Sequence, residues 1–142
     1  MSLEHTLAII KPDAWQAHNA GAIISRIEQE GFAIRGLRLL SLTRAQAEGF
    51  YDVHRGRPFF DELCSFMSSG PCVVMKLEAE GAINRWREVI GATDPAKAAA
   101  GTLRKLYGAN LGHNAVHGSD AAETSVREIG YFFAGYEVGS KA

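Results

Sequence analysis

The sequence predicts an α/β sandwich in which helices pack on one sheet. Segments with the apolar pattern of strands alternate along the chain with segments that have the periodicity of amphipathic helices. The length of 142 residues is that of one domain with one ordinary hydrophobic core. Hydrophobic residues make up 46% and charged residues 22% of the chain, close to the globular averages. We therefore expect one folded, soluble domain over residues 1–142.

The first part of the chain is predicted to contain two strands separated by a helix. Residues 6–10 form a short apolar run that Pro12 ends, which is typical of a strand buried on both faces. The helix runs over residues 21–30, and its apolar stripe consists of Ile23, Ile24 and Ile27. Gly31 stands just past the expected helix end. Residues 32–42 then return to strand character.

The middle of the chain is predicted to hold two helices and a third strand. Thr43 is followed three residues later by Gln46, which is a capping-box pattern and predicts a helix over residues 45–54. Pro58 interrupts this segment, and we expect a short helix after it. Residues 71–78 are rich in β-branched side chains and predict a strand.

The last part of the chain combines two helices with a long connection. The helix over residues 82–91 is expected to present to the core Ile83, Trp86 and Val89 or Ile90. Residues 91–120 are irregular, and a loop of about thirty residues in a compact domain is usually functional. Asp120 and Glu123 repeat the capping pattern and predict the start of the last helix. Its core-facing stripe is expected to consist of Ala122, Val126, Ile129 and Phe133.

Charge and cysteine content restrict the partners and the compartment. Fifteen Lys and Arg against sixteen Asp and Glu leave a formal net charge of −1, so the chain lacks the basic field that nucleic-acid or membrane-surface binding usually requires. We find neither a signal peptide nor an apolar run approaching ~20 residues, and we expect a cytoplasmic protein with no membrane partner. Cys64 and Cys72 match no zinc spacing and are expected to be reduced core residues.

His117 is the first candidate for chemistry. Near neutral pH most imidazoles are uncharged, so one ring nitrogen offers a lone pair to act as base, metal ligand or nucleophile. A nucleophilic histidine needs a group that accepts the proton on its other nitrogen, and Glu128 is the candidate. Small residues share the helical strip of Glu128 and leave room for it to reach His117: Ala121, Thr124 and Ser125. Ser119 is close enough to hold that carboxylate, and the following helix N-terminus favours a phosphoryl group nearby.

Alternative explanations exist for each of these residues. A lone loop histidine is usually a solvated side chain. His113 and His117 could form a metal pair, but that spacing requires a helix, and Gly112, Asn114 and Gly118 argue against one. Taken singly, several other residues have ordinary explanations as surface charges or core aromatics: Lys11, Arg87, Arg104, Phe59 and Phe60.

Together, the motifs of this chain resemble the nucleoside diphosphate kinase family. The stretch NAVHGSD at residues 114–120 is similar to the active-site signature of that family, Asn-x-x-His-Gly-Ser-Asp. Five further stretches match it in order and spacing: IIKPD (9–13), HRGRPFF (54–60), SGP (69–71), GATDP (91–95) and GTLR (101–104). The resemblance covers essentially the whole chain. It implies a ferredoxin-like α+β sandwich, a four-stranded antiparallel sheet with helices packed on it.

The resemblance also implies an activity. The family moves the γ-phosphoryl group of ATP, or of another nucleoside triphosphate, to a nucleoside diphosphate by a ping-pong route, with a phosphohistidine at His117 in this sequence. Glu128, held by Ser119, orients the imidazole. Magnesium is expected to travel between the nucleotide phosphates with few or no direct protein ligands, and Asp120 could contact it through water.

The resemblance further assigns the phosphate contacts. It makes Arg87 and Arg104 guanidinium clamps, which fix both charge and orientation. Thr93 becomes a hydroxyl donor to phosphate, and Tyr51 a phenol near the reacting nitrogen.

Sugar and base contacts follow from the same resemblance. Lys11 and Asn114 would bond the sugar hydroxyls and assist the leaving oxygen. Phe59 would stack on the base, with Leu111 on its other side. An aromatic face and an apolar wall accept any base without reading its edge.

Departures from the family are few. Leu106 stands where members commonly have an aspartate, and His113 stands at a variable position. The family assembles as tetramers or hexamers, so we expect a homo-oligomer.

Two other classes of protein compete with this interpretation. A phosphohistidine relay or carrier protein would also need a reactive imidazole, but it has no use for Lys11, Phe59 and two arginines spread along the chain. A ferredoxin-like RNA-binding module needs exposed aromatics on adjacent strands and a basic face. Residues 6–10 and 72–78 contain no aromatic residue.

Overall fold

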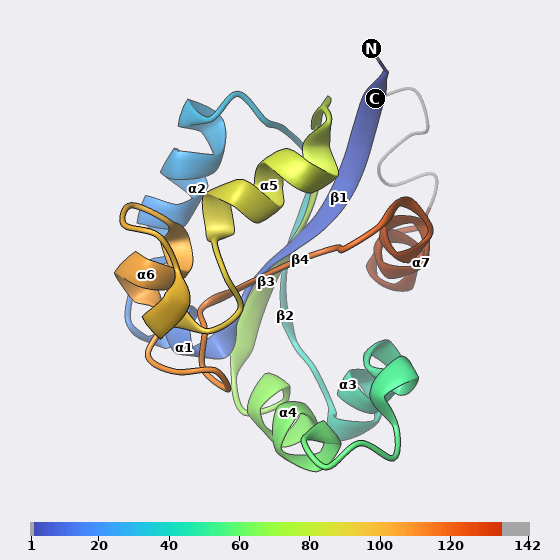
Figure 1. The fold of residues 1–142 in the computed structure, drawn as a ribbon. Helices are drawn as coiled ribbons and strands as arrows, with labels where there is room; N and C mark the ends of the chain where they lie inside the picture. The colour runs from blue at the N-terminus through green and yellow to red at the C-terminus, as the bar shows by residue number, and fades with distance from the viewer. Residues whose placement is uncertain (1, 135–142) are drawn as a thin grey trace.

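A four-stranded antiparallel sheet forms the centre of the fold (Figure 1) in the computed structural model, which describes residues 2–134. The strands are β1 (Leu3–Ile10), β2 (Ala33–Ser41), β3 (Pro71–Glu80) and β4 (Val116–Gly118). They lie in the order β2-β3-β1-β4, and each neighbouring pair is antiparallel. This confirms the sheet that the family resemblance implied.

Helices cover both faces of the sheet. They are α1 (Pro12–Gln16), α2 (Ala20–Gln29), α3 (Arg44–Phe50), α4 (Phe60–Met67), α5 (Ala82–Ile90), α6 (Leu103–Tyr107) and α7 (Ala122–Phe132), with 3₁₀ turns at Asp52–His54 and Pro95–Lys97. Figure 1 shows α2 and α5 on one side of the sheet and α3, α4 and α7 on the other. Within residues 2–134, no helix is long and apolar enough to cross a membrane.

Alternate residues of β1 enter two separate hydrophobic clusters. Ala8 and Ile10 pack with α2 and α5, whereas Leu7 and Ile9 pack with α3, α4 and α7. All four are fully buried. This alternation follows from the two-residue repeat of a strand and confirms that β1 is buried on both faces. The residues that follow β1 and those of β4, which pairs with it, are therefore attached to a fully buried strand.

Two predicted helix boundaries are confirmed by their capping contacts. The side-chain oxygen of Thr43 accepts from the Gln46 backbone N–H at 3.1 Å, and the Gln46 side chain accepts from the Thr43 N–H at 2.9 Å. At the end of α2, Gly31 has φ +90°, which favours glycine. The helix predicted over residues 45–54 is shorter than expected, because α3 stops at Phe50 and a 3₁₀ turn follows.

The segment over residues 91–120 was wrongly expected to lack secondary structure. It contains a 3₁₀ turn, α6 and β4, and β4 supplies the fourth strand by pairing His117 with Ile9 of β1. A strand of three residues has too few positions to show alternation. The sequence analysis also missed α1, which begins directly at Pro12; proline is compatible with the first turn of a helix.

The predicted inner face of α7 was wrong at Ala122 and Val126, which are exposed, but right at Phe133, which is buried, and at Ile129, which packs against the same core cluster. Val126 is 75% exposed, while the buried residues of the helix are Ser125, Glu128 and Phe132. Hydrogen bonds explain why polar residues of α7 face inward. The Ser125 hydroxyl donates to the His5 carbonyl at 2.5 Å, and the Glu128 carboxylate accepts from the Ser119 hydroxyl. Apolar periodicity alone cannot detect a helix face that is held by polar contacts. The predicted Asp120–Glu123 cap is absent too: the helix follows Ala121 without a side-chain cap.

Candidate functional site

The structure brings His117, Glu128 and Ser119 together at the end of the short strand β4. Nε2 of His117 lies 2.9 Å from Oε1 of Glu128. The Ser119 hydroxyl donates to the same carboxylate oxygen at 2.7 Å and accepts from the Leu7 backbone N–H at 3.2 Å. Glu128 and Ser119 are both buried. The carboxylate is therefore fixed between an imidazole and a hydroxyl that is itself anchored to β1.

This contact selects one tautomer of His117. A carboxylate only accepts hydrogen bonds, so Nε2 must hold the proton and donate it to Glu128. In the neutral ring, Nδ1 then keeps its lone pair and is the nitrogen available for reaction. If Nδ1 becomes bonded, the ring gains positive charge, and the adjacent Glu128 carboxylate stabilises that charge.

Trp86 packs against Gly118 and holds the backbone of His117 in place. The Trp86 indole N–H donates to the His117 carbonyl at 3.1 Å. A Cβ atom at position 118 would lie 2.6 Å from Cδ1 of Trp86, so only glycine allows this approach. Phe50 contacts the imidazole edge to face, with the two ring centroids 5.6 Å apart. The sequence identified Trp86 only as a core residue, because its contact with His117 crosses the fold.

A large cavity opens beside His117. Its volume of about 1390 Å³ exceeds the roughly 300–1,000 Å³ of typical ligand pockets. Its wall contains most of the residues expected to act: Lys11, Tyr51, Phe59, Arg87, Thr93, Arg104, Leu111, Asn114, His117 and Asp120. Ser119 and Glu128 are not part of this wall and contact the cavity through His117.

Arg104 forms a buried cationic group in this cavity. Its terminal nitrogens donate to the carbonyls of Gly91 and Val116, both at 2.9 Å. Its Nε has no hydrogen-bond partner among the described residues. Burial, and then the charge of Arg87, lower the pKa of Arg104 to about 10. The guanidinium therefore stays charged at neutral pH. A bound anion would offset the energetic cost of burying this charge.

Lys11 and Asn114 form a second polar group. Nζ of Lys11 donates to the Asn114 side-chain oxygen at 2.8 Å, and the Asn114 amide donates to the Thr93 carbonyl at 3.0 Å. Burial, and then the charge of Arg104, lower the pKa of Lys11 to about 8, against an opposing effect of Asp13. Lys11 is therefore a cation that loses its proton close to physiological pH.

Anion binding in the cavity is expected to weaken as the pH rises above 8. The free protein loses the Lys11 charge as the pH passes its pKa of about 8, whereas the phosphates of the nucleotide that the family resemblance implies would stabilise the protonated amine. Binding above pH 8 must then take up a proton, so the Kd for ADP should rise by up to about tenfold per pH unit. Calorimetric titrations with ADP from pH 7 to 9.5 measure the Kd. Repeating them in buffers of different ionisation enthalpy measures the number of protons taken up on binding.

Lys11→Met is the matched control for this pH dependence, because it keeps the length of the side chain without the charge. The variant should bind ADP more weakly, and its Kd should not change over the same pH range. A Kd of the unmodified protein that stays constant from pH 7 to 9.5 would contradict the assignment.

Tyr51, Phe59 and Leu111 are uncharged residues of the cavity wall, Tyr51 buried and the other two exposed. The Tyr51 hydroxyl is buried without a partner in the described part of the chain, and burial followed by the Glu128 charge raises its pKa. It therefore remains a protonated donor. Phe59 is 48% and Leu111 60% exposed. Exposed apolar side chains at the rim of a polar cavity are typical of a site for a partly aromatic ligand.

His54 is a lining residue that the sequence analysis did not select. Its ring lies between Tyr51 and Phe59, with centroids 6.3 Å and 5.2 Å away. Its position in the stretch HRGRPFF was the available signal. The His54 ring therefore lies between the buried Tyr51 ring and the exposed Phe59 ring.

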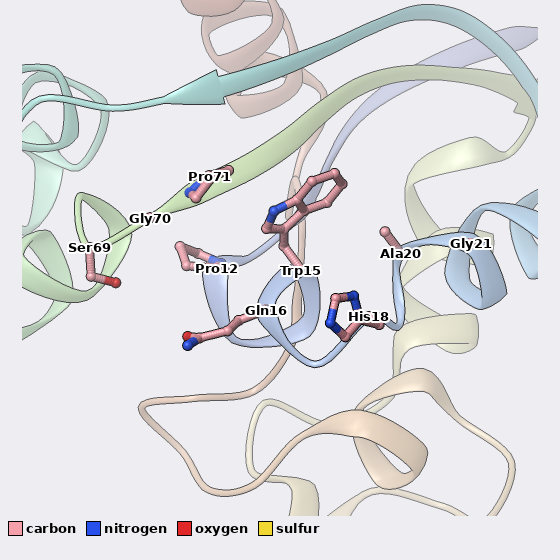
Figure 2. Close-up of a pocket in the computed structure, with 9 residues that line it drawn as sticks. All are labelled: Pro12, Trp15, Gln16, His18, Ala20, Gly21, Ser69, Gly70 and Pro71. Atoms are coloured by element: carbon pink, nitrogen blue, oxygen red, sulfur yellow. The ribbon is translucent and has the colours of Figure 1, made fainter.

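A second hollow lies between α1 and the start of β3. Figure 2 shows Pro12, Trp15 and Gln16 on the side of the hollow near Ser69–Pro71, and His18 on the side near Ala20. No arginine, lysine or carboxylate is among the residues that line it. His18 has φ +64°, an uncommon conformation for a residue other than glycine. Compared with the cavity at His117, this hollow lacks the charged groups that phosphate chemistry requires.

Comparisons with known proteins agree on one family. The family model described as "Nucleoside diphosphate kinase" matches residues 4–138. A nucleoside diphosphate kinase of Sorangium cellulosum is 66% identical over 142 residues, covering 100% of this chain and 99% of the relative. One from Syntrophotalea carbinolica is 63% identical over 136 residues, covering 96% and 99%.

Solved structures give the same result for the fold. The Aquifex aeolicus nucleoside diphosphate kinase superposes with a TM-score of 0.94 at 46% identity, covering 96% of this chain and 99% of that chain. A halophilic enzyme of that name from Halobacterium salinarum, in complex with CDP, has a TM-score of 0.92 at 39% identity, covering 96% and 91%.

Proposed function

Because this chain belongs to the nucleoside diphosphate kinase family, we propose that its phosphotransferase chemistry runs through a phosphohistidine at Nδ1 of His117. The γ-phosphoryl group of ATP, or of another nucleoside triphosphate, is the group transferred. The observation that carries this proposal is the contact of Nε2 with Glu128, which leaves Nδ1 as the reactive nitrogen. The wall of the cavity includes His117.

The reaction consists of two displacements at the same phosphorus. First, the Nδ1 lone pair forms a bond to the γ-phosphorus while the bond to the oxygen shared with the β-phosphate breaks, and a nucleoside diphosphate leaves. Second, a terminal oxygen of another nucleoside diphosphate attacks that phosphorus, and the N–P bond breaks. Nε2 keeps its proton throughout and donates it to Glu128. Such transfers depend mainly on positioning and on charge around the phosphoryl oxygens.

The cationic and hydroxyl groups of the cavity supply that charge and positioning. Arg87 and Arg104 bind phosphate oxygens, and the Thr93 hydroxyl donates to them. Tyr51 donates its hydroxyl near Nδ1. The unpartnered Nε of Arg104 and the unpartnered Tyr51 hydroxyl support these roles, because buried donors without partners are unfavourable until a ligand arrives.

Lys11 and Asn114 are proposed to bind the sugar hydroxyls and the leaving oxygen. Their mutual hydrogen bond of 2.8 Å holds the ammonium in place before the nucleotide binds. The base is proposed to lie between Phe59 and Leu111. Both side chains are exposed at the mouth of the cavity, and neither can read hydrogen-bonding groups on a base.

Magnesium is proposed to arrive on the nucleotide phosphates and to neutralise part of their charge. Residues 2–134 contain no cluster of three or more His, Cys, Asp or Glu side chains that could hold a metal ion. Asp120 lies in the cavity wall and is exposed. Its carboxylate would contact such an ion through one of the waters that Mg²⁺ tends to keep.

We further propose that the chain acts as one domain in a homo-oligomer, either a tetramer or a hexamer. The outer edge of β2 supports assembly, because it ends the sheet and carries Leu37 and Leu39, which are 49% and 54% exposed. A cytoplasmic location is proposed because Cys64 and Cys72 are both buried and free.

Incubation with γ-labelled ATP and Mg²⁺ tests the proposed reaction. The protein should acquire an acid-labile, base-stable label, and addition of GDP alone should discharge it as labelled GTP. A phosphohistidine carrier protein would keep its label until a partner protein was added. Label retained in the presence of every nucleoside diphosphate would overturn the proposal in favour of that alternative.

A further inference from the structure

The rings of His113 and Phe66 join the two sides of the cavity mouth. Phe66 lies near the end of α4, and His113 lies in the connection between α6 and β4. Their centroids are 4.3 Å apart and their planes differ by 18°, which is a stacked arrangement. Both residues line the cavity beside His117. In Figure 1 the connection that follows α6 passes next to α4.

Each ring belongs to a hydrogen-bonded segment that also carries one of the two exposed apolar residues of the cavity wall, Phe59 or Leu111. On one side, Phe59 immediately precedes α4, and its carbonyl accepts the Leu63 N–H at 3.0 Å. Phe59 and Phe66 therefore move together as parts of one helix. The width of the mouth depends on how this helix is placed relative to the facing connection.

The facing connection is held together by its own hydrogen bonds. The Asn110 side-chain oxygen accepts from the backbone N–H groups of Gly112 and His113, both at 3.0 Å. The His113 carbonyl accepts from the Ala109 N–H at 2.8 Å. Leu111 lies between these bonded residues. A displacement of the backbone at His113 would therefore also displace Leu111.

We propose that His113 is a positioning residue whose stack on Phe66 sets the width of the slot between Phe59 and Leu111. The occupant of the slot is the base of the nucleotide, so this inference rests on the proposed function. His113 acts through the two apolar walls and does not contact the phosphates. An aromatic side chain at position 113 makes the slot ready to bind before the nucleotide arrives.

The consequence is restricted to the part of the ligand that lies in the slot. In His113→Ala the stack is lost, and the Kd for ADP should rise between about twofold and tenfold, the range expected for one aromatic pair. The KM for ADP should rise in parallel, while kcat at saturating nucleotide stays unchanged. The Kd for ribose 5′-diphosphate, which has the sugar and phosphates but no base, should also stay unchanged.

Two further variants separate positioning from general damage to the fold. His113→Phe restores a stacking ring without the imidazole and should restore the Kd for ADP. Phe66→Leu removes the facing ring but keeps apolar volume, and it should raise the Kd for ADP as much as His113→Ala does. Combining Phe66→Leu with His113→Ala should add no further loss, because both remove the same contact. Thermal unfolding of each variant verifies that it is folded.

These experiments can disprove the positioning role of His113 while the proposed function remains valid. An unchanged Kd for ADP in His113→Ala, or an equal loss for ADP and ribose 5′-diphosphate, would show that the stack does not act on the base. If His113→Ala failed to fold, Phe66→Leu would provide the same comparison. Failure of the proposed function would show differently, as the absence of a phosphoenzyme in the unmodified protein.

Discussion

His117→Ala is expected to lower turnover by about 10⁴-fold or more, the scale at which removal of a nucleophile acts in other covalent mechanisms. The variant keeps Lys11, Arg87 and Arg104, so it should still bind ADP with nearly unchanged affinity. Exchange of the γ-phosphoryl group between labelled ATP and GDP measures turnover, and calorimetry measures binding.

His18→Asn is the matched control for the loss of an imidazole. His18 lies in the second hollow and lines no part of the cavity beside His117, and asparagine tolerates its positive φ. This variant should retain full turnover. Turnover of His117→Ala within about tenfold of the unmodified protein would rule out His117 as the nucleophile.

Glu128→Gln is expected to slow the phosphoryl step by about 10²- to 10⁴-fold. The amide has the same shape but no negative charge, so it stabilises the phosphorylated, positively charged ring less. It can also present its NH₂ group to Nε2 and favour the wrong tautomer of His117. Single-turnover labelling with γ-labelled ATP isolates this step from nucleotide binding, which should be nearly intact.

Ser119→Ala provides a graded comparison for Glu128→Gln. It removes one hydrogen bond to the carboxylate and keeps its charge, so the phosphoryl step should slow by only about tenfold, the effect of one hydrogen bond to a charged group. The role of Glu128 would be wrong if ADP binding collapsed in Glu128→Gln while turnover persisted.

Elements with strong local signals could be predicted from the sequence. The run Thr6–Ile10, the apolar stripe of α2 and the capping pair Thr43 and Gln46 all behave as their local patterns predict. The strand β4 and the buried polar positions of α7, Ser125 and Glu128, could not be predicted from apolar periodicity, because they are decided by contacts with β1 and with the residues that follow β4. Periodicity has no access to such contacts.

The residues of the site also divide into those that local sequence patterns predict and those that depend on contacts across the fold. Local reasoning joined His117 to Glu128 and Ser119, because small neighbours left room for the carboxylate. The binding residues came only from the family resemblance, since Lys11 and Asn114 are separated by about a hundred positions and meet through the sheet. Neither approach found Trp86 behind His117 or His54 and Phe66 at the mouth. Trp86 contacts His117 through a hydrogen bond, and His54 and Phe66 make ring contacts; local sequence patterns show none of these long-range contacts.

Identification of the phosphorylated atom decides whether His117 reacts through Nδ1. The contact between Nε2 and Glu128 predicts that the phosphoryl group resides on Nδ1 of His117. The measurement is ³¹P NMR of the isolated phosphoenzyme under alkaline conditions, combined with mass spectrometry of its peptides. The predicted result is Nδ1-phosphohistidine at position 117 as the main species. Phosphate on Nε2, or a stable ester on Ser119, would rule out Nδ1 of His117 as the reacting atom.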